Sequence, residues 1–155
     1  MILSNFISQE NVIARAKLYS KKRIFETLAS LLGGNSEVLQ SIPSTDLYQK
    51  LNEREKIGST AIGGGVVIPH CRSSLVKATR MALIILDSPV DYDAPDNISV
   101  DIFVALIFPD ETKDIHLSFL SSLAKLFRND SFKTDLRIAN SKADLYNIIL
   151  NSEEI

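Results

Sequence analysis

Apolar and polar residues alternate along this chain with two different periods, which divide it into helical and strand-like segments. Apolar residues recur at helical spacing in residues 19–32, 45–55, 112–128, 132–138 and 141–150. Short β-branched and apolar runs predict strands at 12–14, 66–69, 80–86 and 100–108. The glycines at 33–34 are expected to end the first helix, and Ser44 or Thr45 to cap the second. Ser141 and Asp144 resemble a capping box at the start of the last helix.

The order of these segments predicts the fold class. Residues 100–108 begin with an alternating pattern and continue as an uninterrupted apolar run, as expected for a strand covered on both faces. Helices before and after the central strands favour an α/β fold, with a mixed sheet and helices packed around it. The sequence shows no repeat and no clear linker, so residues 1–155 are interpreted as a single domain. The order of the strands stays open.

Composition and charge exclude several classes of function. Hydrophobic residues make up 45% of the chain and charged residues 23%, as in an ordinary globular protein. A net charge of −2 and a pI of about 5.7 argue against nucleic acid or anionic lipid as a partner. The longest apolar run, 102–108, is too short for membrane insertion, and no secretory signal is recognisable. The single cysteine, Cys71, fits a reducing compartment, so a cytoplasmic location is expected.

The chemistry of the chain is expected to centre on His70. Glycines at 63–65 allow the backbone to approach a ligand closely, and residues 66–68 form a short β-branched run. Pro69 favours an extended conformation before it, so the strand should end where His70 begins. Arg72 follows two residues later. An imidazole beside exposed N–H groups and a cation is suited to accept a phosphoryl group on nitrogen.

His116, the second of two histidines, has two interpretations. It lies in the first turn of the 112–128 helix, on the apolar face that includes Phe119 and Phe127. On that face a histidine is commonly a core residue with one hydrogen bond. The start of a helix that follows a strand also favours anion binding. If the strand that carries His70 ends on the same side as strand 100–108, the two imidazoles meet.

Other chemistries have little support. Two histidines and one cysteine make a thin set of metal ligands. Cys71 is interpreted as a small packing residue in preference to a nucleophile. The glycines at 63–65 are not followed by the Lys-Ser/Thr pair of a P-loop and otherwise read as a plain turn. Arg54 and Arg72 would by default be solvated surface charges, and 87–96 a solvent-facing loop.

The segment from Asn52 to His70 closely resembles the phosphorylation-site signature of EIIA domains of the mannitol/fructose class. These domains belong to the bacterial phosphoenolpyruvate-dependent phosphotransferase system. The resemblance continues through 100–109, His116-Leu117 and Leu145-Tyr146, and so spans nearly the whole chain.

Within that class the chain is most similar to the stand-alone nitrogen-regulatory EIIA proteins, through residues 20–23 and 92–97. Two positions depart from the signature. Val67 replaces the usual alanine, and Cys71 replaces the commoner glycine or alanine. The cysteine is expected to fit the space and to make the site sensitive to oxidation.

The resemblance implies a fold, a reaction and a set of residues. The fold would be the EIIA type 2 sandwich, with about five strands. His70 would accept a phosphoryl group from an HPr-like phosphohistidine protein, His116 would bind its oxygens or hold the ring, and Arg54 would neutralise charge. Backbone N–H groups or hydroxyls for the phosphoryl oxygens are expected from Ser59, Thr60, Gly64 and Gly65, and the two hydroxyl residues are equally suited to turn or capping roles. Neither a cofactor nor a metal is expected.

Three functions remain open from the sequence. The first is a regulatory phosphocarrier that controls partner proteins, such as components of potassium transport or a sensor kinase. The second is a sugar-specific EIIA that passes phosphate to an EIIB during sugar uptake. The third is a binding module of the same fold in which His70 is structural.

Overall fold

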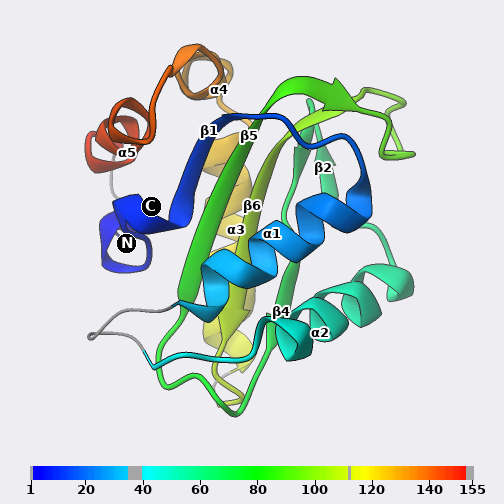
Figure 1. Ribbon diagram of the computed structural model, residues 1–155, viewed down its shortest axis with the longest axis vertical. Helices are drawn as coiled ribbons and strands as arrows, with labels where there is room; N and C mark the ends of the chain where they lie inside the picture. The colour runs from blue at the N-terminus through cyan, green and yellow to red at the C-terminus, as the bar shows by residue number, and fades with distance from the viewer. Residues whose placement is uncertain (1, 35–39, 112, 153–155) are drawn as a thin grey trace.

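The computed structural model describes residues 2–34, 40–111 and 113–152 and contains one mixed sheet (Figure 1). Its strands are β1 (Val12–Ala16), β2 (Ala61–Gly63), β3 (Val66–Val67), β4 (His70–Arg72), β5 (Arg80–Val90) and β6 (Val100–Phe108). The strand order is β1-β5-β6-β3-β2, and β4 pairs with β6 beyond the end of β3. β5 is antiparallel to β6, whereas β3 and β4 run parallel to it. The sheet class and the approximate number of strands are therefore as predicted.

The described residues form five α-helices around the sheet: α1 (Lys21–Gly33), α2 (Ser44–Ile57), α3 (Lys113–Phe127), α4 (Asp130–Ile138) and α5 (Lys142–Leu150). Figure 1 shows α1 and α2 in front of the sheet and α3 behind it. Alternate residues of β6 contribute to the two cores, because successive side chains of a strand point to opposite faces. Phe103 and Ala105 pack with α1 and α2, and Val104 and Leu106 pack with α3, α4 and α5. None of the helices in the described part of the chain has the length and apolarity needed to cross a bilayer.

The helix boundaries follow the predictions within two residues, except that residue 112 lies outside the described residues. The Ser20 and Ser141 side chains cap α1 and α5, and each accepts a hydrogen bond from the backbone N–H three residues later. The prediction for α2 is wrong in detail: the residue before the helix is Pro43, and neither Ser44 nor Thr45 caps it.

The strand that carries His70 differs from the prediction. The strand register with β6 covers Val66–Val67, is missing at Ile68 and Pro69 and resumes at His70, although the Pro69 carbonyl still accepts from the Leu106 N–H at 2.9 Å. Because proline has no N–H, it cannot continue a hydrogen-bonded ladder as a donor. His70 therefore begins a new strand segment instead of following the end of one.

The predicted loop at 87–96 also begins later than expected. β5 continues to Val90, and its register with β6 shifts between Ile85 and Val90. Pro89 lies in this irregular part of the strand, where a proline is tolerated.

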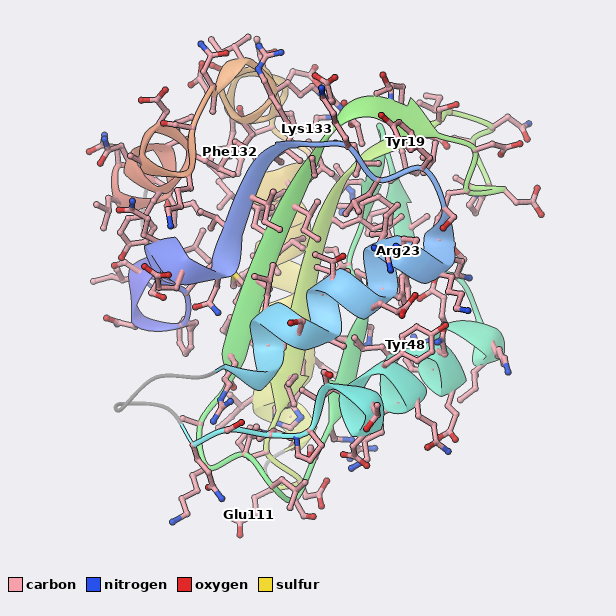
Figure 2. The ribbon with its side chains drawn as sticks, viewed as in Figure 1. Tyr19, Arg23, Tyr48, Glu111, Phe132 and Lys133 are labelled. Atoms are coloured by element: carbon pink, nitrogen blue, oxygen red, sulfur yellow. The ribbon has the colours of Figure 1, made fainter. Side chains whose placement is uncertain are left out.

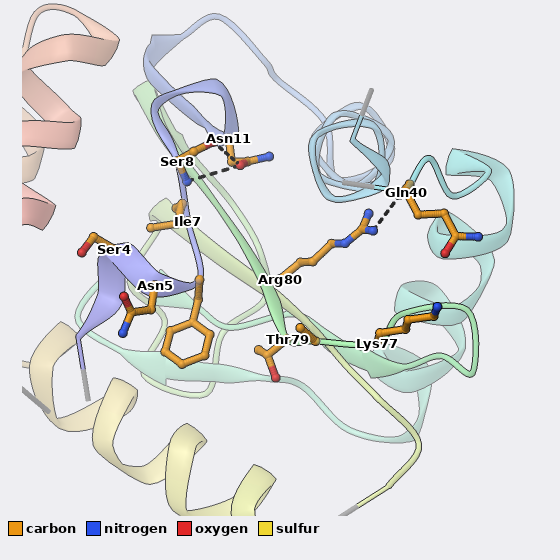
Figure 3. A pocket seen from close by; sticks show the side chains of 11 residues that line it. Ser4, Asn5, Ile7, Ser8, Asn11, Gln40, Lys77, Thr79 and Arg80 are labelled. Atoms are coloured by element: carbon orange, nitrogen blue, oxygen red, sulfur yellow. Dashed lines mark hydrogen bonds between the residues drawn. The ribbon is translucent and has the colours of Figure 1, made fainter. Parts of the chain in front are cut away.

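Arg80, the first residue of β5, connects the sheet to the end of α1. Its guanidinium donates hydrogen bonds to the carbonyl groups of Leu32 and Gly33. It also donates to the carbonyl of Gln40 (Figure 3). These include the last carbonyls of α1, where a cation is favourable. A cavity of about 640 Å³ lies beside it, lined by the N-terminal segment and residues 77–80. Burial lowers the pKa of Arg80.

The turn between β2 and β3 is held by cations from α4. The Gly64 carbonyl accepts hydrogen bonds from Lys133 Nζ and Arg137 Nη2, and the Arg137 guanidinium also binds both carboxylate oxygens of Asp101. Lys133 lies near the upper end of the sheet in Figure 2, whereas Glu111, which follows β6, lies at the lower end. The glycine turn is therefore an anchor for α4.

Two glycine substitutions should have opposite effects on stability. Gly58 has an extended φ of 176°, and an added Cβ would meet nothing within 4 Å. Gly58→Ala should raise the free energy of unfolding by about 0.4–1 kcal/mol, because alanine restricts the unfolded chain. Gly65 has a φ of +84°, and an added Cβ would lie 2.8 Å from Arg137 Nη2. Gly65→Ala should lower the free energy of unfolding by about 1–3 kcal/mol. Urea denaturation measures both values, and equal effects would contradict this account.

Candidate functional site

A cavity of about 810 Å³ opens at one end of the sheet, beside the edge formed by β4. The last turns of α2 and the first turns of α3 form its two sides. Its lining includes Lys50, Glu53, Arg54, Ile57, His70, Arg72, Asp110, His116 and Leu117. We call this cavity the histidine pocket.

Parallel pairing of β4 with β6 brings the two histidines to one pocket. His70 is paired with Leu106, and Arg72 with Phe108, the last residue of β6. Since β4 and β6 run in the same direction, the strand that carries His70 ends on the same side of the sheet as β6, where the chain continues into α3. This was the condition for the two imidazoles to come together, and both of them line the histidine pocket.

His116 belongs both to the core and to the pocket. Its ring stacks on Phe108 with the ring centroids 4.2 Å apart and the planes 19° apart. The residue is 8% exposed. Burial lowers the pKa of His116, and the charge of Arg72 lowers it further. The ring is therefore held in place and favours its neutral form.

The hydrogen bond of His70 defines its tautomer. Nδ1 lies 2.9 Å from the carbonyl oxygen of Ile68. A carbonyl only accepts, so Nδ1 carries the proton and donates, and Nε2 retains a free lone pair. Burial lowers the pKa of His70, and the hydrogen bond to Ile68 raises it. The charge of Arg54 lowers this pKa further, whereas the charge of Glu55 raises it. The net result is a neutral ring with Nε2 available as a nucleophile.

Two arginines contribute positive charge to the pocket. Arg54, near the end of α2, donates from Nη1 to the Gly58 carbonyl at 2.9 Å. Arg72 lines the pocket from β4 and acts electrostatically on His116. Arg72 is exposed and also lies in the pocket, so it is both a surface charge and the cation that the sequence placed two residues after His70.

The hydroxyl groups of Ser59 and Thr60 form hydrogen bonds within their own segment of the chain. The Ser59 hydroxyl accepts from the N–H of Ala61. The Thr60 hydroxyl donates to a Glu55 carboxylate oxygen at 2.7 Å. Neither residue is part of the lining of the histidine pocket. Of the two roles expected from the sequence, the geometry favours the structural one.

Gly64 and Gly65 are not brought together with His70. The N–H of Gly64 donates to Asp96, and Gly65 lies at the start of the β3–β6 pairing, five residues before His70. In an extended chain five residues span about 16 Å. The expectation that these glycines bind phosphoryl oxygens is therefore corrected, because their backbone groups hold the β2–β3 turn.

Cys71 packs in the core between the sheet and α1–α2, and although it also borders the histidine pocket it is only 8% exposed. Burial raises the pKa of its thiol to about 12. The charges of Lys50 and Asp46 have smaller effects, the first lowering this pKa and the second raising it. A thiol in this environment stays protonated and unreactive. The expected sensitivity to oxidation is therefore not supported.

Within the described parts of the chain, no three His, Cys, Asp or Glu side chains are grouped as a metal site would require. The histidine pocket instead combines a neutral imidazole with a free Nε2 lone pair, a second stacked imidazole and three cations, Lys50, Arg54 and Arg72. This arrangement suits the binding and transfer of an anionic group.

Comparison with known proteins identifies the family. The model of the family "Phosphoenolpyruvate-dependent sugar phosphotransferase system, EIIA 2" matches residues 5–152. The chain belongs to this EIIA family. It is 35% identical over 132 residues to a nitrogen regulatory protein of Pseudomonas aeruginosa, an alignment that covers 85% of this chain and 84% of the relative.

Two solved structures share the EIIA fold. The crystal structure of the nitrogen regulatory protein IIA-Ntr from Neisseria meningitidis has a TM-score of 0.84 and 33% identity, covering 95% of this chain and 98% of the other. The mannitol IIA of Escherichia coli, in a complex with phosphorylated mannitol IIB, has a TM-score of 0.72 at 16% identity, covering 94% and 98%. The first supports the nitrogen-regulatory branch of the EIIA family, and the second supports the fold alone.

The charge of Arg54 should be visible in the titration of His70. The pKa of His70 in the wild-type protein should lie below 6.5, so more than half of the rings are neutral at pH 6.5. Arg54→Gln removes a cation that opposes protonation, so the pKa of His70 should rise. Two-dimensional NMR of the imidazole resonances measures both values. Arg23→Gln, an exposed arginine of α1 outside the pocket lining, is the matched control and should leave the pKa unchanged. An unchanged or lower pKa in Arg54→Gln would refute the assignment.

The thiol of Cys71 should react slowly in the folded protein. At pH 8 a thiol with a pKa of about 12 is almost entirely protonated. Alkylation by iodoacetamide should therefore be slower by at least about tenfold than in urea-unfolded protein. Mass spectrometry measures both rates. Similar rates in the two states would show that Cys71 is accessible and reactive.

Proposed function

We propose that this EIIA protein is a phosphocarrier that accepts a phosphoryl group on Nε2 of His70. The single observation that carries the proposal is the hydrogen bond from Nδ1 to the Ile68 carbonyl, which leaves Nε2 with its lone pair in a pocket shared with His116. Phosphoryl transfer requires mainly positioning and stabilisation of negative charge. The histidine pocket has residues suited to both.

The proposed donor is a phosphohistidine of an HPr-like carrier protein, reacting with its ring protonated. The Nε2 lone pair of His70 forms the new N–P bond while the N–P bond of the donor breaks. The bonding pair stays with the nitrogen of the donor, which leaves as a neutral imidazole. Nδ1 of His70 keeps its proton throughout, and its bond to Ile68 strengthens as the ring gains positive charge. Atoms, protons and charge therefore balance.

Arg54 and Arg72 are proposed to stabilise the transferring group from two sides. Both are cations of the pocket lining, and a planar guanidinium binds two oxygens of a phosphoryl group at once. His116 is proposed to bind a third oxygen, since its ring is fixed by stacking on Phe108. Backbone N–H groups in the first turn of α3 add favourable partial charge.

The rim of the pocket supports a protein as the donor. Ile57 is 84% exposed and Leu117 is 69% exposed, and both line the pocket. Ile115, on the same turn of α3 as Leu117, is 62% exposed. Exposed apolar side chains around a polar centre are typical of protein interaction sites.

The nitrogen-regulatory relatives favour a regulatory role for the phosphoryl group. In this role the phosphorylation state of His70 selects regulated partners, of which potassium transporters and sensor kinases are the candidates. The alternative is transfer to an EIIB in fructose- or mannitol-type uptake, which the fold shared with the mannitol IIA of the IIA–IIB complex supports. A binding module with a structural His70 is the third candidate.

Labelling from phosphoenolpyruvate tests the proposal. With the general carrier proteins present, the wild-type protein should gain an acid-labile, base-stable ³²P label, and His70→Ala should gain none. His116→Ala should still be labelled but at least about tenfold more slowly, since it loses stabilisation and not the nucleophile. Circular dichroism should show that both variants are folded.

Two outcomes separate the alternatives. A folded wild-type protein that takes no label from several carriers would refute the phosphocarrier and leave the binding module. Rapid transfer of the label to a purified mannitol- or fructose-type EIIB would favour the sugar branch, whereas label that stays on the protein would favour the regulatory branch.

A further inference from the structure

Glu55, next to Arg54 on α2, has a carboxylate with an unusual environment. The residue is 6% exposed. Its oxygens accept three hydrogen bonds, from the Thr60 N–H at 3.0 Å, the Thr60 hydroxyl at 2.7 Å and the Tyr92 hydroxyl at 2.9 Å. Three donors suit an ionised carboxylate, which only accepts. The site is built to hold a negative charge.

No arginine or lysine of the described residues forms an ion pair with Glu55. The nearby cation Lys21 instead lies over the ring of Tyr92, with its Nζ 4.9 Å from the centroid. Burying an unpaired charge is costly, even when hydrogen bonds compensate for part of the cost. A neutral amide could keep the two hydrogen bonds at one oxygen, but the Thr60 hydroxyl would then have to turn and accept. The cost of burying the charge therefore calls for an explanation.

A chain of hydrogen bonds connects this carboxylate to the ring of His70. The Thr60 N–H binds Glu55, and the Thr60 carbonyl accepts from the Ile68 N–H at 3.1 Å. The Ile68 carbonyl in turn accepts from Nδ1 of His70 at 2.9 Å. A shift of the Glu55 carboxylate would therefore act, through Thr60 and Ile68, on the carbonyl group that fixes the tautomer of His70.

We propose that Glu55 is a positioning residue for phosphoryl transfer, whose buried negative charge favours the positive charge that develops on the His70 ring as Nε2 bonds to phosphorus. The inference rests on the proposed function of His70. Glu55 acts through the Thr60–Ile68 chain and through its field, and does not touch the phosphoryl group.

The electrostatic setting of His70 supports this assignment. Arg54 lowers the pKa of His70 and the neighbouring Glu55 raises it. The other charged or titratable groups that line the pocket are Lys50, Glu53, Cys71, Arg72, Asp110 and His116. Glu55 lies outside this lining, and it combines burial with a hydrogen-bonded connection to the ring. Adjacent residues of α2 thus have opposite effects: Arg54 attracts the phosphoryl oxygens, and Glu55 keeps the ring nucleophilic.

The experiment compares loss of charge with loss of a hydrogen bond. Glu55→Gln removes the charge with nearly the same shape, whereas Tyr92→Phe removes one donor and keeps the charge. Glu10→Gln, an exposed residue outside the pocket, is the matched charge control. For each protein, NMR gives the pKa of His70, and ³²P labelling at pH 8 gives the rate of phosphorylation. At pH 8 the His70 ring is neutral in every variant, so the rate does not report the neutral fraction.

Glu55→Gln should lower the pKa of His70 and slow phosphorylation by roughly threefold to tenfold, the scale of one charge acting at moderate distance through protein. The pKa and the rate should stay near wild-type values in Tyr92→Phe and Glu10→Gln. An unchanged pKa and rate in Glu55→Gln would overturn the inference, as would equal effects of Glu55→Gln and Tyr92→Phe.

Two further comparisons separate failure of the inference from unfolding and from failure of the proposed function. If Glu55→Gln is unfolded, the same substitution is made with Gly58→Ala, which is expected to add stability. If the wild-type protein takes no label, the proposed function fails, but the pKa comparison still tests the coupling of Glu55 to His70.

Discussion

The parallel pairing of β4 with β6 is the interaction on which the rest of the site depends. Pro69 interrupts the ladder, and pairing resumes at His70, which is set opposite Leu106. The pairing puts His70 and Arg72 beside the end of β6, where the chain turns into α3 and brings His116 back onto Phe108. The Ile68 carbonyl accepts from Nδ1 of His70, whereas the next carbonyl, that of Pro69, accepts from the Leu106 N–H of β6. The same short segment therefore supplies both the position and the tautomer of the ring.

Much of this arrangement could be predicted from the sequence, because strong local patterns specify it. Helical spacing predicted the five helices, and the run at 100–108 predicted the central strand. The apolar face of α3 placed His116 towards the sheet, and the motif ending at His70 identified the proposed nucleophile. In each of these cases the signal lies within a few residues of the feature that it predicts.

The errors arise where the deciding partner is remote or competes for the same group. Gly64 looked suited to bind a phosphate through its N–H, but this group donates to Asp96, which lies 32 positions later in the chain. Thr60 was equally suited to phosphoryl binding and to a local role, and its hydroxyl donates to Glu55. Only the three-dimensional fold reveals these partners, since no local pattern distinguishes a free polar group from an occupied one.

The charges of the histidine pocket have a consequence for recognition. Its lining has three cations, Lys50, Arg54 and Arg72, against the two acids Glu53 and Asp110. A phosphoryl group carries close to two negative charges at neutral pH, and the His70 ring that keeps its Nδ1 proton gains one positive charge, so phosphorylation would cancel the net positive charge of the lining. The apolar rim would stay the same in both states. A partner could then distinguish the two forms by charge complementarity alone, with no change in the backbone.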